Sequence, residues 1–93
     1  MKHQRHFGSA TVISLRKVAQ ISALISDLDR RVQILDCSIA AEEERARVFG
    51  PSDAAYPILA RTLTARRNNL KETIAALEKR LASLQDRTEL VPA

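Results

Sequence analysis

Glycine, proline and aromatic residues are all scarce in this sequence of 93 residues. It contains two glycines, three prolines and no tryptophan, and aromatic residues make up only 3% of it. Alanine, leucine, isoleucine, arginine and glutamate are abundant instead, which is typical of long helices. A chain of this length forms one domain at most and has little material for a deep pocket. The composition therefore predicts a small all-α protein without a small-molecule substrate.

Cysteine is also scarce, since Cys37 is the single one and no intramolecular disulfide can form. A reducing compartment is the simpler assumption, so we expect a cytoplasmic protein. Arg16 and Lys17 interrupt the start of the chain before it could form the apolar part of a signal peptide. The longest uncharged stretch of the main helical pattern, Val18 to Ser26, is much shorter than the roughly 20 residues that cross a membrane. We therefore expect a soluble protein without a membrane partner.

Motifs of catalysis and metal binding are missing as well. The sequence has no glycine-rich phosphate loop and no grouping of a nucleophile with histidine and an acid. His3 and His6 have no neighbouring thiol or carboxylate, which falls short of a closed set of metal ligands. Glu42, Glu43 and Glu44 point in different directions around a helix and cannot form a paired-carboxylate centre. The sequence indicates a non-enzymatic protein with no metal and no cofactor, and no motif is specific enough to indicate a family.

The net charge of +4 is concentrated at the start of the chain. Residues 1 to 17 carry basic residues and no acid, so the rest of the chain is neutral overall. Within that rest, residues 27 to 53 have an excess of acids and residues 54 to 80 an excess of basic groups. This distribution favours a fold in which the two segments lie side by side.

Apolar residues recur at alternating spacings of three and four on both sides of a central bend. This heptad pattern is typical of helices that pack as a coiled coil. The first seam consists of Val18, Ile21, Ile25, Leu28, Val32, Leu35 and Ile39. The second seam consists of Leu63, Arg67, Leu70, Ile74, Leu77, Leu81 and Leu84. The pattern therefore predicts two long helices.

The bend is the segment FGPSDAAYP, residues 49 to 57. Gly50 can adopt the left-handed conformation that ends a helix, and Asp53 can accept hydrogen bonds from the first N–H groups of the next one. Pro57 leaves two alternatives: it lies in the first turn of a helix that starts at Asp53, or the long helix begins at Pro57. We predict a flexible basic arm at 1 to 10, a helix at 11 to 48, a turn at 49 to 53, a helix at 54 to 88 and a frayed tail at 89 to 93.

Two helices of similar length joined by a short connection lie antiparallel, and their register can be tested layer by layer. Pairing Val32 with Leu70 places Leu28 opposite Ile74, and every layer along the seam is aliphatic except the one that contains Arg67. The long stem of Arg67 can cover the seam while its guanidinium reaches outward. The sequence therefore predicts a long antiparallel two-helix hairpin.

The same register predicts two ion pairs between the helices, Asp36 with Arg67 and Asp29 with Lys71. Exposed ion pairs of this kind contribute about 0 to 1 kcal/mol, so they adjust the register without holding the hairpin together. Near the turn the register places Tyr56 against the first helix. We expect the contact there to be less extensive and more exposed to water, and so wetter, than the contacts along the seam.

The first helix has more apolar surface than one seam uses. Ile34, Cys37 and Ala41 form a second strip at i, i+3 and i+7, and Leu24 also lies outside the seam. Because a lone two-helix seam is thin, we expect the hairpin to complete a four-helix bundle as a homodimer or by docking on another helical protein. The predicted partner-binding residues are Leu24, Ile34, Cys37 and Ala41. The predicted function is that of a small helical adaptor, regulator or secretion-type chaperone.

A nucleic-acid-associated regulatory factor is the alternative function. Clustered basic groups can contact phosphates. However, the sequence has no aromatic platform for single strands and no short helix-turn-helix pattern. The residues of this alternative are Lys2, Arg5, Arg61, Arg66, Arg67 and Lys71.

Overall fold

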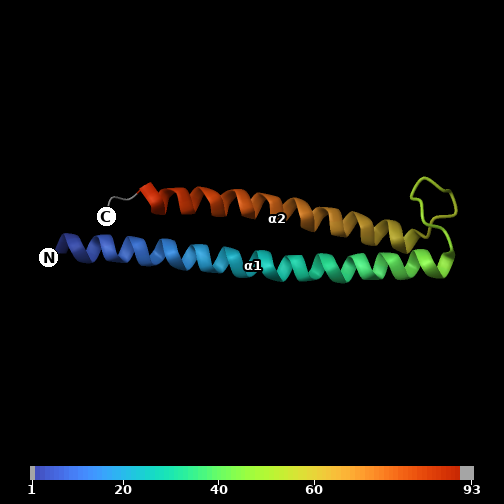
Figure 1. Ribbon diagram of the computed structural model, residues 1–93, viewed down its shortest axis with the longest axis horizontal. Coiled ribbons are helices and arrows are strands. Elements are labelled where there is room, and N and C mark those ends of the chain that lie inside the picture. The colour runs from blue at the N-terminus through green and yellow to red at the C-terminus, as the bar shows by residue number, and fades with distance from the viewer. Residues whose placement is uncertain (1, 91–93) are drawn as a thin grey trace.

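The computed structural model of the chain shows two long antiparallel helices (Figure 1). It describes residues 2 to 90, with side chains for residues 12 to 86. Helix α1 spans Lys2–Ala46 and helix α2 spans Ile58–Leu90. The start of α1 and the end of α2 lie at one end of the hairpin, and the loop lies at the other. Residues 2 to 90 contain no strand, and the predicted helical hairpin is confirmed.

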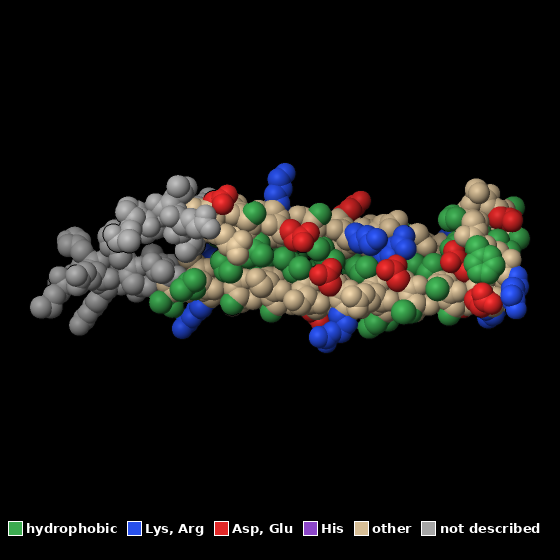
Figure 2. Space-filling view, in the orientation of Figure 1, with side chains coloured by type: hydrophobic (Ala, Val, Ile, Leu, Met, Phe, Trp, Pro, Cys, Tyr) green, Lys and Arg blue, Asp and Glu red, His purple; other side chains and the backbone are tan. Residues whose placement is uncertain are grey.

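A narrow apolar seam joins the helices and appears as a band between them (Figure 2). Its centre is a cluster of Leu28, Val32 and Ile74, against which Ile25, Leu70 and Leu77 pack. These side chains are the ones that the predicted register places in consecutive layers. The packing therefore agrees with the register at the middle of the hairpin.

The C-terminus of α1 is closed by Arg47 and not by Gly50. Arg47 has a φ of 58°, in the left-handed region, and the N–H of Val48 donates to the carbonyl of Glu43 at 3.3 Å. A left-handed residue followed by this hydrogen bond is the Schellman motif. Gly50 has no positive φ, so the prediction that it ends the helix is wrong. The reason is that α1 stops at Ala46, which places the left-handed position at Arg47.

The connection between the helices is longer than the predicted turn. The carbonyl of Asp53 accepts a hydrogen bond from the N–H of Tyr56 at 3.1 Å, and its carboxylate accepts one from the N–H of Ala55 at 2.9 Å. Asp53 therefore supports the loop and does not cap α2. The first helical hydrogen bond runs from the N–H of Arg61 to the carbonyl of Pro57 at 3.1 Å. The structure agrees with the second alternative, because α2 begins at Ile58, directly after Pro57, and not at the predicted residue 54.

The outer limits of the helices also differ from the prediction. Helix α1 already begins at Lys2, whereas the helix was predicted from residue 11, and α2 continues to Leu90, past the predicted end at 88. The last part of the predicted tail, residues 91 to 93, is outside the range that the structure describes.

No helical stretch within the described range, residues 2 to 90, is both apolar enough and long enough to cross a lipid bilayer.

The turn end contains the most buried side chains of the described hairpin, so the prediction of a wetter contact there is wrong. Tyr56 is 4% exposed and Ala60 is fully buried, compared with 8% exposure for Leu28 in the middle of the seam. The loop brings the Tyr56 ring back onto α1, where its hydroxyl donates to Glu43 Oε2 at 2.8 Å. An aromatic ring thus covers the end of the seam.

Arg67 occupies the seam position at which an aliphatic side chain is expected. Its Nη1 donates to Asp36 Oδ1 at 3.0 Å, and the side chain is 26% exposed. The stem therefore lies along the seam while the charged end reaches Asp36, as predicted. The other predicted pair is wrong, since Asp29 and Lys71 do not form an ion pair among the side chains that the structure describes.

Replacement of Arg67 by leucine is expected to stabilise the hairpin. The exposed ion pair with Asp36 contributes about 0 to 1 kcal/mol, whereas a buried leucine contributes about 1.5 to 3 kcal/mol. For a domain of this size, each kcal/mol raises the unfolding temperature by about 4 to 8 °C. Thermal unfolding followed by circular dichroism measures the change, with Arg66→Leu on the exposed neighbour as the control. A lower midpoint for Arg67→Leu alone would contradict this interpretation of the seam.

Candidate interaction surface

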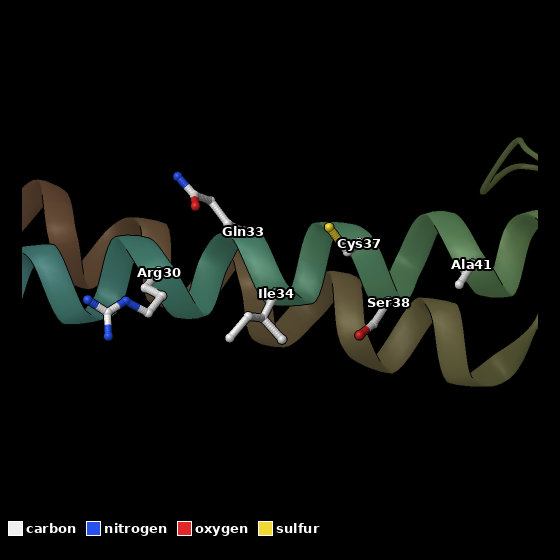
Figure 3. A pocket seen from close by; sticks show the side chains of 6 residues that line it. All are labelled: Arg30, Gln33, Ile34, Cys37, Ser38 and Ala41. Atoms are coloured by element: carbon white, nitrogen blue, oxygen red, sulfur yellow. The ribbon is translucent and has the colours of Figure 1, made fainter.

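A shallow apolar groove lies on the face of α1 that is turned away from α2 (Figure 3). It is lined by Arg30, Gln33, Ile34, Cys37, Ser38 and Ala41. All of these side chains come from α1, and α2 lies behind that helix in the view. The groove therefore belongs to one helix alone and is not part of the contact inside the hairpin.

Helical periodicity explains why this face is free. Each residue turns the helix by about 100°, so Ile34 lies almost opposite Val32, which is buried against α2. Ile34 is 59% exposed, and Cys37 and Ala41 are exposed beside it. The second strip thus faces away from the seam. Ile34 lies at its edge and also lines a shallow groove between the helices with Leu35 and Leu70.

The structure brings three of the four predicted partner-binding residues together. Ile34, Cys37 and Ala41 line the groove, as their spacing predicted. Leu24 is 46% exposed but is not part of this groove. It precedes Ile34 by about 15 Å along the helix, because each residue advances the axis by about 1.5 Å. The contiguous surface is therefore shorter than the predicted set.

Charged side chains of opposite sign mark the two ends of the apolar strip. Arg30 and Glu44 continue the spacing of three and four at the N-terminal and C-terminal ends of the strip. Arg30 makes no ion pair with any side chain that the structure describes. Glu44 pairs with Arg47 at 3.3 Å, and both side chains are mostly exposed. We call Arg30, Ile34, Cys37, Ala41 and Glu44 the outer strip.

The middle of the outer strip is small and uncharged. Cys37 is a free, exposed thiol, and Ala41 follows it after one helical turn. Small side chains allow a second helix to approach closely. No cluster of histidine, cysteine and acidic residues that could hold a metal ion occurs in the part of the chain with described side chains.

Sequence reasoning missed a second set of exposed apolar side chains near the loop. Phe49, Ile58 and Leu59 are large and apolar, and Ile58 is 82% exposed. No pattern in the sequence marks the exposure of Phe49, because Tyr56, the other aromatic residue of the same connection, is buried. These residues flank the connection and are separate from the outer strip.

The predicted basic cluster is divided between internal contacts and solvent. The guanidinium of Arg61 lies 5.3 Å from the centre of the Tyr56 ring, and its Nη2 donates to the carbonyl of Asp53 at 3.0 Å. Arg67 is bound to Asp36. Both cations therefore make contacts inside the hairpin and are less available to a phosphate.

The other members of the cluster are exposed or outside the described side chains. Arg66 and Lys71 are exposed and form no ion pair with a described side chain. Arg66 lines a groove between the helices together with Arg31. The side chains of Lys2 and Arg5 are not among those described.

Comparison of the chain with protein-family models, with curated proteins and with solved structures finds no match.

Proposed function

We propose that the protein is a non-enzymatic interaction module that binds another helix along the outer strip of α1. The observation that carries this proposal is the exposure of Ile34, Cys37 and Ala41 in one groove on the face opposite the seam. Side chains at i, i+3 and i+7 are the anchors with which one helix docks on another.

The thin seam supports the same proposal. Among the described side chains, the central core cluster consists of Leu28, Val32 and Ile74, and no large side chain is fully buried. A partner that binds only the folded chain shifts the folding equilibrium toward the folded state. The apolar surface that it buries stabilises that state further. A helical partner on the outer strip would lie on the side of α1 away from α2 and would bury apolar surface that the hairpin leaves exposed. The result would be a coiled-coil or four-helix arrangement, as expected for a cytoplasmic adaptor, regulator or secretion-type chaperone.

Substitution of Ile34 by glutamate tests this function. A tagged chain is used to recover partners from a native lysate treated with nuclease, and the recovered protein is quantified. We expect Ile34→Glu to reduce recovery at least about 10-fold, because a charge buried against an apolar partner is strongly unfavourable. Ala76→Glu is the matched control, since Ala76 is exposed on α2 and follows the buried Ile74 by two residues, as Ile34 follows Val32. Equal recovery by wild type and Ile34→Glu would contradict the proposal.

The nucleic-acid alternative has narrower support, from the exposed cations Arg66 and Lys71. The nuclease treatment distinguishes the two functions. Loss of every partner after treatment would favour this alternative, and a stoichiometric protein partner that survives it would favour the interaction module.

A further inference from the structure

The two charges of the outer strip are placed symmetrically about its central residue, Cys37. Arg30 precedes Cys37 by seven residues and Glu44 follows it by seven, so that the two charges are equally distant from the thiol. Each charge is thus one heptad away from Cys37, with one apolar residue of the strip between them. The strip therefore has a positive end, an apolar middle and a negative end, with Cys37 at its centre.

We propose that the outer strip pairs with a second copy of the same chain, with the two α1 helices antiparallel and a two-fold axis at Cys37. This inference rests on the proposed function and names its partner. In this arrangement Arg30 meets Glu44 of the second copy, and Glu44 meets Arg30 of the second copy. A two-fold interface requires this kind of self-complementarity, because the same patch appears on both sides.

The opposite orientation is disfavoured by the same charges. In a parallel pair with Cys37 in register, Arg30 would face Arg30 and Glu44 would face Glu44. Like charges across an interface are unfavourable, and charged flanking positions set the orientation of paired helices. The apolar middle alone would permit either orientation, so the charges select the antiparallel one.

A second pair of charges is placed in the same way. Asp27 precedes Cys37 by ten residues, and Arg47, which directly follows the end of α1, comes ten residues after it, again with opposite signs. The carboxylate of Asp27 pairs with Arg31 at 3.3 Å, and Arg47 pairs with Glu44. The Asp27 side chain is 49% exposed and the other three are more exposed. They can therefore contribute to a pairing of two chains without the loss of a buried contact inside the hairpin.

The size of the middle side chains suits close packing of two helices. Cys37 and Ala41 are small, and Ile34 is the one large apolar anchor of the outer strip in each copy. Two copies would bury both isoleucines together with the small residues between them. Because the apolar middle is short, we expect a weak dimer, with a dissociation constant in the range of about 1 to 100 μM.

Cysteine cross-linking tests the orientation. The variants Arg30→Cys and Glu44→Cys are each made with Cys37→Ser, and the two chains are oxidised separately and as a mixture. The antiparallel pairing predicts a disulfide between position 30 and position 44 in the mixture and little product from either chain alone. Efficient cross-linking of each variant with itself would indicate a parallel pair and overturn the proposal.

Charge exchange tests the energetic basis in the full chain without cysteine chemistry. Sedimentation equilibrium measures self-association of the wild type and of Arg30→Glu, Glu44→Arg and the double variant. Each single variant is expected to weaken association about 10-fold, because it creates two like-charge contacts, and the double variant is expected to restore it within about 3-fold. Circular dichroism verifies that all four chains remain helical. A double variant as weak as the single ones would contradict the pairing.

The two proposals can fail separately. A wild-type chain that stays monomeric at about 100 μM overturns self-pairing. If that monomer still recovers a stoichiometric helical partner that Ile34→Glu abolishes, the proposed function holds and the partner is a different chain. If Ile34→Glu changes neither self-association nor recovery, both proposals are wrong.

Discussion

Ile74→Ala is expected to lower the free energy of unfolding by about 2 to 5 kcal/mol. Ile74 is buried at the centre of the seam in a cluster with Leu28 and Val32. Truncation to alanine removes buried methyl groups and leaves a cavity that two rigid helices can close only in part. Because small domains have little stability to spare, a loss of this size would unfold a large fraction of the chains. Urea denaturation followed by circular dichroism measures the change.

The same helix supplies a matched control for this substitution. Ile58 is 82% exposed, so Ile58→Ala is expected to change the free energy of unfolding by no more than about 0.5 kcal/mol. Both variants delete the same atoms from α2, and they differ only in what those atoms contact. Equal effects would show that the seam does not hold the hairpin together.

Tyr56→Ala is expected to lower the unfolding temperature about as much as Ile74→Ala. The ring is buried at the turn end, its hydroxyl donates to Glu43 at 2.8 Å, and the guanidinium of Arg61 lies over its face. Truncation would leave the end of the seam open and would release the loop from α1. Tyr56→Phe keeps the ring and is expected to have a smaller effect. If both variants unfold at the wild-type temperature, the turn end does not contribute to stability.

The Tyr56 hydroxyl also gives a pH dependence with a defined sign. Burial raises the pKa of Tyr56 above its ordinary value of 10.0, and the hydrogen bond to Glu43 and its negative charge raise this pKa further. The folded state therefore favours the protonated phenol. Its stabilising contribution is complete below about pH 10 and is lost as the pH rises through the raised pKa. The difference in unfolding temperature between wild type and Tyr56→Phe is expected to shrink above pH 10, and a difference that grows there would contradict this account.

The seam could be predicted from the sequence because the apolar residues that form it recur at a regular spacing. Apolar residues at spacings of three and four identify the inner face of each helix, and the short connection makes the helices antiparallel. Even the exception was informative, since Arg67 lies beside Asp36 as the register requires. The packing of two helices that are far apart in the sequence therefore follows from the heptad repeat.

The loop could not be predicted in the same way, because its conformation depends on competing local choices. Gly50 is the residue most suited to a left-handed backbone, yet Arg47 adopts that conformation because α1 ends earlier. The buried position of Tyr56 depends on the path of the loop and on an acceptor, Glu43, from the other side of the connection. Neither feature has a spacing that marks it in the sequence.

The outer strip was predicted in part. The spacing of Ile34, Cys37 and Ala41 was sufficient to place them on one face, and the groove contains all three. Leu24 shares their apolar character but lies too far along the helix to join them. The role that we propose for Arg30 and Glu44 depends on where the apolar residues begin and end, and the sequence alone did not single these two charges out.

The distance between spin labels on the two helices tests the central claim that α1 folds back against α2. Cysteines replace Arg31 and Arg66, which line one groove between the helices, with Cys37→Ser to remove the native thiol. Labelled chains are diluted with unlabelled ones, so that pulsed electron resonance reports distances within one chain. Helix axes that pack at about 8 to 10 Å predict a label separation below about 25 Å. A separation near about 50 Å, the length of an unbroken helix between these positions, would contradict the account.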